Sequence, residues 1–231
     1  MNKIILALLM AAALSTASAN PQVEASAANA RGDYAAELKI TRPLAEGGVV
    51  WAQSFIGDSF YYGRGVKQNF AEAAKWYRLA AAQGNALAQV NLGLMHEEGE
   101  GVLQDYAEAA RWYRLAAERG DADAQVNLGF LLDNGKGMVQ NSVEAAKWYR
   151  LAAEQGNASA QHNLGLMYGR GQGVVQDHKK AHMWFNLAAV KRGSESAKAR
   201  DLAAKRMTPQ QIGEAQTMAR QCMERNFKGC D

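Results

Sequence analysis

The sequence contains little proline and cysteine and carries almost no net charge. Only three of its 231 residues are proline, a residue that interrupts helices because it lacks a backbone donor and clashes with the preceding turn. The formal net charge of +3 is too small to indicate binding to nucleic acid or to an anionic membrane surface. Alanine, leucine, glutamine and glutamate are abundant, so the composition predicts a helical protein.

Long apolar runs are scarce as well, and the one that stands out is at the start. An early lysine precedes an apolar run over residues 4–14, and small residues follow in the order "ASA". This pattern predicts a secretory signal peptide over residues 1–19, cleaved between Ala19 and Asn20. A membrane anchor needs about 20 apolar residues, so we expect no membrane insertion after cleavage and a periplasmic or secreted protein.

One phrase recurs at a fixed interval. "WYRLAA" begins at Trp76, Trp112 and Trp148, and "WFNLAA" begins at Trp184, each 36 residues after the last. A period of this length indicates stacked supersecondary units. The four predicted repeats cover residues 43–78, 79–114, 115–150 and 151–186.

Each repeat is predicted to contain two helices. In the third repeat the first helix is "ADAQVNLGFLLDN", here called helix A, and the second is "SVEAAKWYRLAAEQ", called helix B. The turn between them is "GKGMVQ". Asn141 can cap helix B, and Glu144 lies three residues later, as in a capping box. The glycines of the turn end helix A, because glycine readily adopts a left-handed conformation.

The array is predicted to extend beyond the four repeats on both sides. An orphan helix B over residues 33–46 begins at Asp33, which lies 36 residues before the cap Asn69. Residues 20–32 are predicted to be a disordered linker. Residues 191–231 are predicted to form a helical cap, which a repeat array needs to close its apolar end.

The repeated phrase is predicted to be part of the core and to take no part in chemistry. Its Trp and Tyr lie four residues before alanines, so large and small side chains form adjacent stripes on helix B. Gly93 and its equivalents allow a close approach on helix A. Truncation of one such Trp to Ala is expected to cost roughly 3–5 kcal/mol.

The stretch "AQVNLGLMHEEGEGVLQDYAEAARWYRLAAERGDADAQ" resembles the Sel-one-like repeat (SLR) family, which is related to tetratricopeptide repeats. The resemblance covers about residues 33–190. It implies an all-α fold, a right-handed α/α superhelical solenoid with a terminal helical cap. It also implies a non-enzymatic adaptor or scaffold that binds a protein or peptide, without naming that partner.

Several patterns with chemical potential were considered and rejected. A phosphate-binding loop follows a strand, whereas a helix precedes each G-x-G turn here. "HEEGE" at 96–100 lacks the second histidine of a zinc protease motif. His178 and His182 lie four residues apart and could share a metal, but a solvated surface is the simpler interpretation. We therefore predict no catalytic residue, cofactor or metal ligand.

An alternative function follows from the resemblance. Some cysteine-rich relatives of this family are associated with β-lactam binding or hydrolysis, so a β-lactam-binding or cell-wall-active enzyme is the second hypothesis. The usual serine enzyme of this kind needs Ser-x-x-Lys, and no serine of this chain has a lysine three residues later.

Cys222 and Cys230 are the only cysteines. A disulfide is the default in an oxidising compartment, and the C-x7-C spacing also matches that of the cysteine-rich relatives. One continuous helix would hold the two residues about 12 Å apart, so a disulfide requires a turn, which Asn226 and Gly229 can supply. The alternative is a pair of free thiols.

A partner is predicted to dock on helix A, which by analogy with the family lines the concave surface. An asparagine recurs there in phase, with an apolar residue three positions later and a varied residue seven positions later. The amides could clamp the backbone of an extended peptide, or they could hydrogen-bond the adjacent helix and fix the stacking. The predicted binding residues are Asn91, Leu94, Glu98, Asn127, Phe130, Asn134, Asn163, Leu166 and Arg170.

Overall fold

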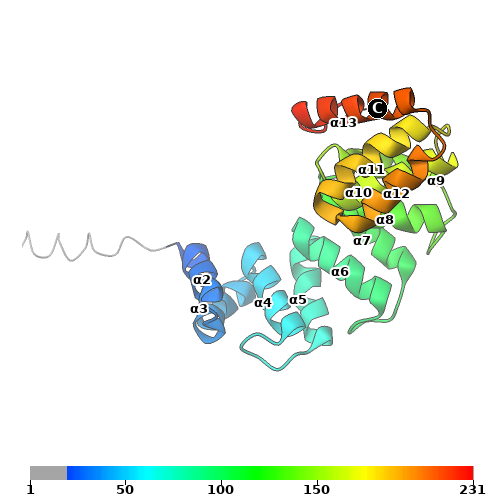
Figure 1. The fold of residues 1–231 in the computed structure, drawn as a ribbon. Coiled ribbons are helices and arrows are strands. Elements are labelled where there is room, and N and C mark those ends of the chain that lie inside the picture. Colours follow the sequence, from blue (N-terminus) through cyan, green and yellow to red (C-terminus); the bar gives the residue numbers. More distant parts are fainter. Residues whose placement is uncertain (1–19, 231) are drawn as a thin grey trace, which may run out of the picture. The chain divides into compact units, whose positions relative to one another are not determined.

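The computed structural model describes residues 20–230, so the predicted signal peptide lies outside the described residues. That part of the chain contains twelve helices joined by turns and no strand, which confirms the all-α prediction (Figure 1). The helices are α2 (Pro21–Ala30), α3 (Tyr34–Glu46), α4 (Val50–Tyr62), α5 (Phe70–Ala82), α6 (Ala86–Glu98), α7 (Tyr106–Ala117), α8 (Ala122–Asn134), α9 (Ser142–Ala153), α10 (Ala158–Arg170), α11 (His178–Arg192), α12 (Ser194–Ala204) and α13 (Pro209–Glu224).

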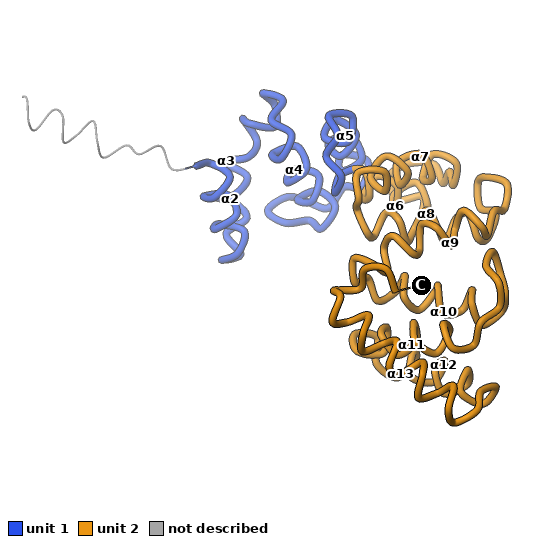
Figure 2. Tube along the Cα trace, turned by 90° about the horizontal axis from the view of Figure 1, so that it is seen from above, with its two compact units in different colours: residues 1–88 blue, residues 89–231 orange. Residues whose placement is uncertain are grey.

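The chain divides into two compact units, residues 1–88 and 89–231, with the division inside α6 (Figure 2). Unit 1 contains α2 to α5, and its core is built from α3 and α4, with Ile56 fully buried. Unit 2 contains most of α6 and all of α7 to α13. The 36-residue period gives no sign of this division, because it continues unchanged through α6.

Helix B begins in the same way in every repeat. The side chains of Asn69, Asp105, Asn141 and Asp177 each accept a hydrogen bond from a backbone amide of the first turn. The capping box has both of its hydrogen bonds only at α13, among the described helices, where Thr208 and Gln211 form it. The acidic residues of the earlier repeats instead pair with basic side chains, as Glu144 does with Arg114 of the preceding repeat.

A glycine of helix A meets an aromatic ring of helix B in each repeat. A Cβ atom built on Gly93 would lie 2.6 Å from the ring of Tyr113, and one on Gly129 would lie 2.9 Å from the ring of Tyr149. Gly57 and Gly165 have the same relation to Tyr77 and Phe185. The close approach predicted for these glycines is therefore confirmed, and the ring that fills the space is the second aromatic of the phrase.

The two aromatics of the phrase differ in burial. The tyrosines at 77, 113 and 149 are at most 2% exposed. Of the tryptophans, only Trp184 is fully buried, while Trp76, Trp112 and Trp148 are half-buried. The prediction that every Trp fills the core is therefore wrong for the first three repeats, where Tyr takes that place.

The second glycine of the turn touches the preceding repeat. Gly137 has a φ of +70°, and a Cβ atom there would lie 2.4 Å from the carbonyl carbon of Tyr106, at the start of α7. Gly173, with a φ of +68°, has the same relation to Ser142 at the start of α9. The G-x-G turn therefore serves close packing between repeats.

The structure differs from the prediction of a disordered linker over residues 20–32. Residues 21–30 form α2, which Asn20 caps and Pro21 begins. Ala25 and Ala28 are buried, and the Asn29 side chain donates to Glu37 on α3 at 2.8 Å. Burial of one small-residue face against α3 stabilises a helix whose sequence alone carries little apolar signal.

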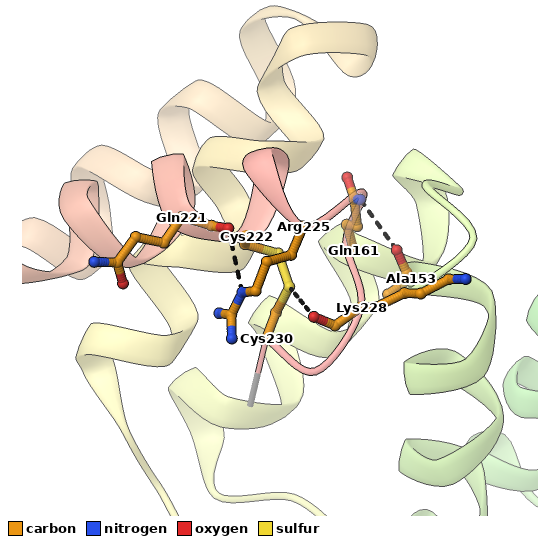
Figure 3. The surroundings of a disulfide bond; sticks show 7 residues. All are labelled: Ala153, Gln161, Gln221, Cys222, Arg225, Lys228 and Cys230. Atoms are coloured by element: carbon orange, nitrogen blue, oxygen red, sulfur yellow. Dashed lines mark hydrogen bonds between the residues drawn. A yellow bond between two sulfur atoms is a disulfide. The ribbon is translucent and has the colours of Figure 1, made fainter.

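The chain ends in a turn held by a disulfide between Cys222 and Cys230, as the cysteine spacing predicts (Figure 3). The Cα atoms lie 5.2 Å apart, because the chain reverses direction after α13. Asn226, Phe227 and Gly229 all have positive φ in this reversal. The ring of Phe227 lies against Gly156, so the turn fixes α13 to the connection between α9 and α10.

Candidate binding surface

The predicted binding residues lie on α6, α8 and α10, the helices A of unit 2. Each asparagine is half-buried in the middle of its helix. The apolar position is exposed in Leu94 and Phe130, at 37% and 39%, and half-buried in Leu166. The third position, Glu98, Asn134 and Arg170, is exposed at the end of each helix.

Two of the asparagines lie near a tyrosine of the preceding helix B. The amide of Asn127 on α8 favours the ionised form of Tyr113 on α7 and so acts to lower its pKa, and the amide of Asn163 on α10 acts in the same way on Tyr149 of α9. The Tyr113 hydroxyl in turn donates to the Glu97 carboxylate on α6 at 2.9 Å. These contacts are the kind that the stacking hypothesis requires, and contact of the same amides with a peptide backbone stays a prediction.

The environment of these tyrosines keeps them protonated. Burial raises the pKa of Tyr113 far above its ordinary range, and the charge of Glu97 raises it further. Burial, followed by the charge of Asp133, does the same to the pKa of Tyr149. Each phenol is therefore protonated at neutral pH and can donate a hydrogen bond.

Five of the predicted residues line one hollow, which we call the α8–α10 hollow. It has a volume of about 180 Å³ and lies over Tyr149. The other four, Asn91, Leu94, Glu98 and Asn127, do not line it. The five predicted residues that do are Phe130, Asn134, Asn163, Leu166 and Arg170.

A larger hollow, the α10–α12 hollow, follows on the same side. Its volume is about 410 Å³, and it shares Leu166 and Arg170 with the smaller one. Leu202 and Arg206, which also line it, lie 36 residues after these two. Sequence reasoning missed α12 as a fifth helix A, because the tryptophan landmark ends at Trp184, although the spacing could have revealed it.

Sequence reasoning also missed a recurring buried glutamine. Gln125 on α8 donates to the carbonyl of Ala117 at 3.1 Å, and Gln161 on α10 donates to that of Ala153 at 3.2 Å (Figure 3). Each bond satisfies a carbonyl at the end of the preceding helix B, which would otherwise have no partner inside the helix. The signal was the "AQ" dipeptide, which recurs every 36 residues.

One cluster contains the residue types of a nucleophilic triad. The His162 Nδ1 atom lies 2.9 Å from the Ser196 hydroxyl, and its Nε2 atom lies 3.7 Å from the Glu195 carboxylate. Ser196 is 0% exposed, so a substrate has no access to its hydroxyl in this structure. The cluster joins α10 to α12.

The two histidines considered as metal ligands lie in different surroundings. His182 is 2% exposed in the core, whereas His178 is half-buried at the start of α11 and lines the α10–α12 hollow. Within residues 20–230, no group of three or more His, Cys, Asp or Glu side chains could hold a metal ion. None of the helices in that range has the length and apolarity that a membrane-spanning helix requires.

Comparison with protein families decides what these repeats are. The model of the Sel1 repeat matches residues 52–85, 86–121, 122–157 and 158–189, more than half of the chain. The chain belongs to the Sel1 repeat family. It is therefore a helical repeat scaffold, and the helix A–turn–helix B units described above are Sel1 repeats.

Solved structures of other Sel1 repeat proteins have the same fold. A Sel1 repeat protein from Oxalobacter formigenes is 32% identical, with a TM-score of 0.77 over 86% of this chain and 81% of that one. The protein c5321, a protective antigen of uropathogenic Escherichia coli strains with an SLR fold, is also 32% identical, with a TM-score of 0.73. That alignment covers 85% of this chain but only 46% of c5321. A search of curated proteins gave no significant match.

The last Sel1 repeat is expected to lose stability in mild acid. Burial, followed by the charge of Arg192, lowers the pKa of His162, and burial, followed by that of Arg200, lowers the pKa of His182. Each contribution is fully present above the ordinary value of 6.5 and is lost as the pH falls toward the lowered folded pKa. The melting temperature should therefore fall between about pH 7 and about pH 5.

Substitution of the two buried histidines provides the test. A His162→Gln/His182→Gln variant should show a flatter dependence of melting temperature on pH over that interval, measured by circular dichroism. The half-buried His178 serves as control, and His178→Gln should keep the wild-type dependence. An unchanged slope in the double variant would contradict the prediction.

Proposed function

We propose that this protein is a non-enzymatic binding scaffold that acts in the periplasm or outside the cell. It binds an extended segment of a protein or peptide partner along α8, α10 and α12. The observation that carries the proposal is that two hollows lie side by side on these helices and share Leu166 and Arg170.

The surface has the features of a peptide groove. Apolar side chains at 36-residue intervals, Phe130, Leu166 and Leu202, can each receive an apolar side chain of the partner. Polar residues flank them at equal intervals. Such a mixture of apolar contact and convergent polar groups is typical of binding sites.

The location outside the cytoplasm is supported by two features. The first 19 residues have the pattern of a secretory signal. The disulfide in the terminal cap would persist in an oxidising compartment. The non-enzymatic role is supported by the inaccessibility of the Ser196 hydroxyl, the nucleophile of the triad-like cluster.

The proposal can be tested with peptides selected from a random displayed library on the purified, oxidised protein. Affinity for the selected peptides is then compared between wild type and Phe130→Ser. Because Phe130 is a large, central side chain of the surface, the variant should bind about tenfold more weakly or worse.

The matched control is Leu151→Ser, which alters an apolar side chain on helix B of similar exposure, 46% against 39% for Phe130. This variant should keep wild-type affinity. Failure to select any peptide on the wild-type protein, or equal losses in the two variants, would refute the proposed surface.

A further inference from the structure

The α10–α12 hollow is rich in positive charge. Arg170, Arg206 and His178 line it, and no Asp or Glu does. Both arginines are exposed, and within residues 20–230 their guanidinium groups form no ion pair or hydrogen bond with another side chain. These donors are therefore available to an anionic partner.

At one position of the repeat, the side chain changes from acidic to basic along the surface. Positions 36 residues apart carry Glu98 on α6, Asn134 on α8, Arg170 on α10 and Arg206 after α12. The adjacent α8–α10 hollow has one carboxylate in its lining, that of Asp133. This group already accepts hydrogen bonds from Gln172 at 2.8 Å and Ser142 at 2.7 Å. The α10–α12 hollow thus has cations and no carboxylate in its lining, whereas the α8–α10 hollow has both Arg170 and Asp133.

The same hollow offers an apolar floor between its cations. Leu166, Phe185 and Leu202 line it together with two alanines of α12. Leu202 is 64% exposed, so its side chain is accessible to a partner. The volume of about 410 Å³ can hold a large side chain of a partner.

We propose that the α10–α12 hollow binds an extended acidic segment of a protein partner, in which one large apolar side chain is flanked by carboxylates. The inference rests on the proposed function and names the chemistry of the partner. The apolar side chain occupies the floor, and the carboxylates pair with Arg170 and Arg206. Guanidinium groups bind carboxylates through two parallel hydrogen bonds.

The same peptide selection, now read for composition, tests the inference. On the wild-type protein it should enrich Asp and Glu next to Phe, Leu or Met. A charge-reversed variant, Arg170→Glu/Arg206→Glu, should bind these peptides about tenfold more weakly or worse, and its own selection should enrich Lys and Arg. Rising salt should weaken binding to the wild type.

The matched control reverses two exposed cations away from the hollow, Lys147 on α9 and Arg220 on α13. Lys147→Glu/Arg220→Glu changes the net charge equally and should retain wild-type affinity and preference. If the first variant melts at a lower temperature than wild type, the milder Arg170→Gln/Arg206→Gln replaces it, with the same expected loss of acidic preference.

The outcomes separate this inference from the proposed function. Peptides that require Phe130 but show no acidic enrichment, or that bind the charge-reversed variant equally well, would overturn the inference and leave the proposed function standing. Equal losses in the charge-reversed variant and its control would also overturn the inference. A wild-type protein that selects no peptide would refute both.

Discussion

Gly173→Ala is expected to destabilise unit 2 by about 3–4 kcal/mol. The added Cβ atom would lie 2.1 Å from the carbonyl oxygen of Ser142, which is backbone of α9 and cannot rotate away. The φ of +68° adds a cost of about 1–2 kcal/mol for any residue with a Cβ atom. Urea denaturation followed by circular dichroism measures the effect.

Gly120→Ala separates the two costs. Gly120 also has a positive φ, of +92°, but a Cβ atom there would have no neighbour within 4 Å. This variant should lose only about 1–2 kcal/mol, the conformational cost alone. Equal losses in the two variants would show that contact with Ser142 contributes nothing.

Tyr149→Ala is expected to cost about 3–5 kcal/mol, more than the same change at the neighbouring and larger Trp148. Tyr149 is 2% exposed and its ring fills the space over Gly129, so truncation leaves a cavity. It also removes the phenol near which the Asn163 amide lies. Chemical denaturation of both variants gives the comparison.

Trp148→Ala is the matched variant, since it alters the adjacent residue of the same helix. Trp148 is half-buried, so solvent can occupy much of the vacated space, and the loss should be about 1–2 kcal/mol. A Trp148 variant as unstable as the Tyr149 variant would contradict the burial seen here.

Much of the fold could be predicted because each repeat contains the same local signals. Asn141 and its equivalents begin helix B, the glycines end helix A, and Gly129 marks the contact with an aromatic ring. These signals depend on a few neighbouring residues. The choice between Trp148 and Tyr149 as the buried ring does not, because the two side chains are adjacent on the helix and the neighbouring helices decide which one is covered.

The candidate surface could be predicted only in part. Phe130, Leu166 and Arg170 were found because they recur in phase with the tryptophans. Leu202 and Arg206 keep the phase, but the residues around them have lost the repeat pattern. Helix α2 was missed for a different reason: its stability comes from packing of Ala25 and Ala28, which an isolated stretch of small residues does not reveal.

The glycine contacts between repeats bear on how the gene can change. Gly137 and Gly173 touch the backbone of the preceding repeat. Insertion or deletion within the G-x-G turn would therefore break a contact that holds two successive repeats together. Gly120, in the connection between two successive repeats, has open space around it. Duplications and losses of whole 36-residue blocks with breakpoints at such connections preserve every glycine contact, so relatives should differ in repeat number far more often than in turn length.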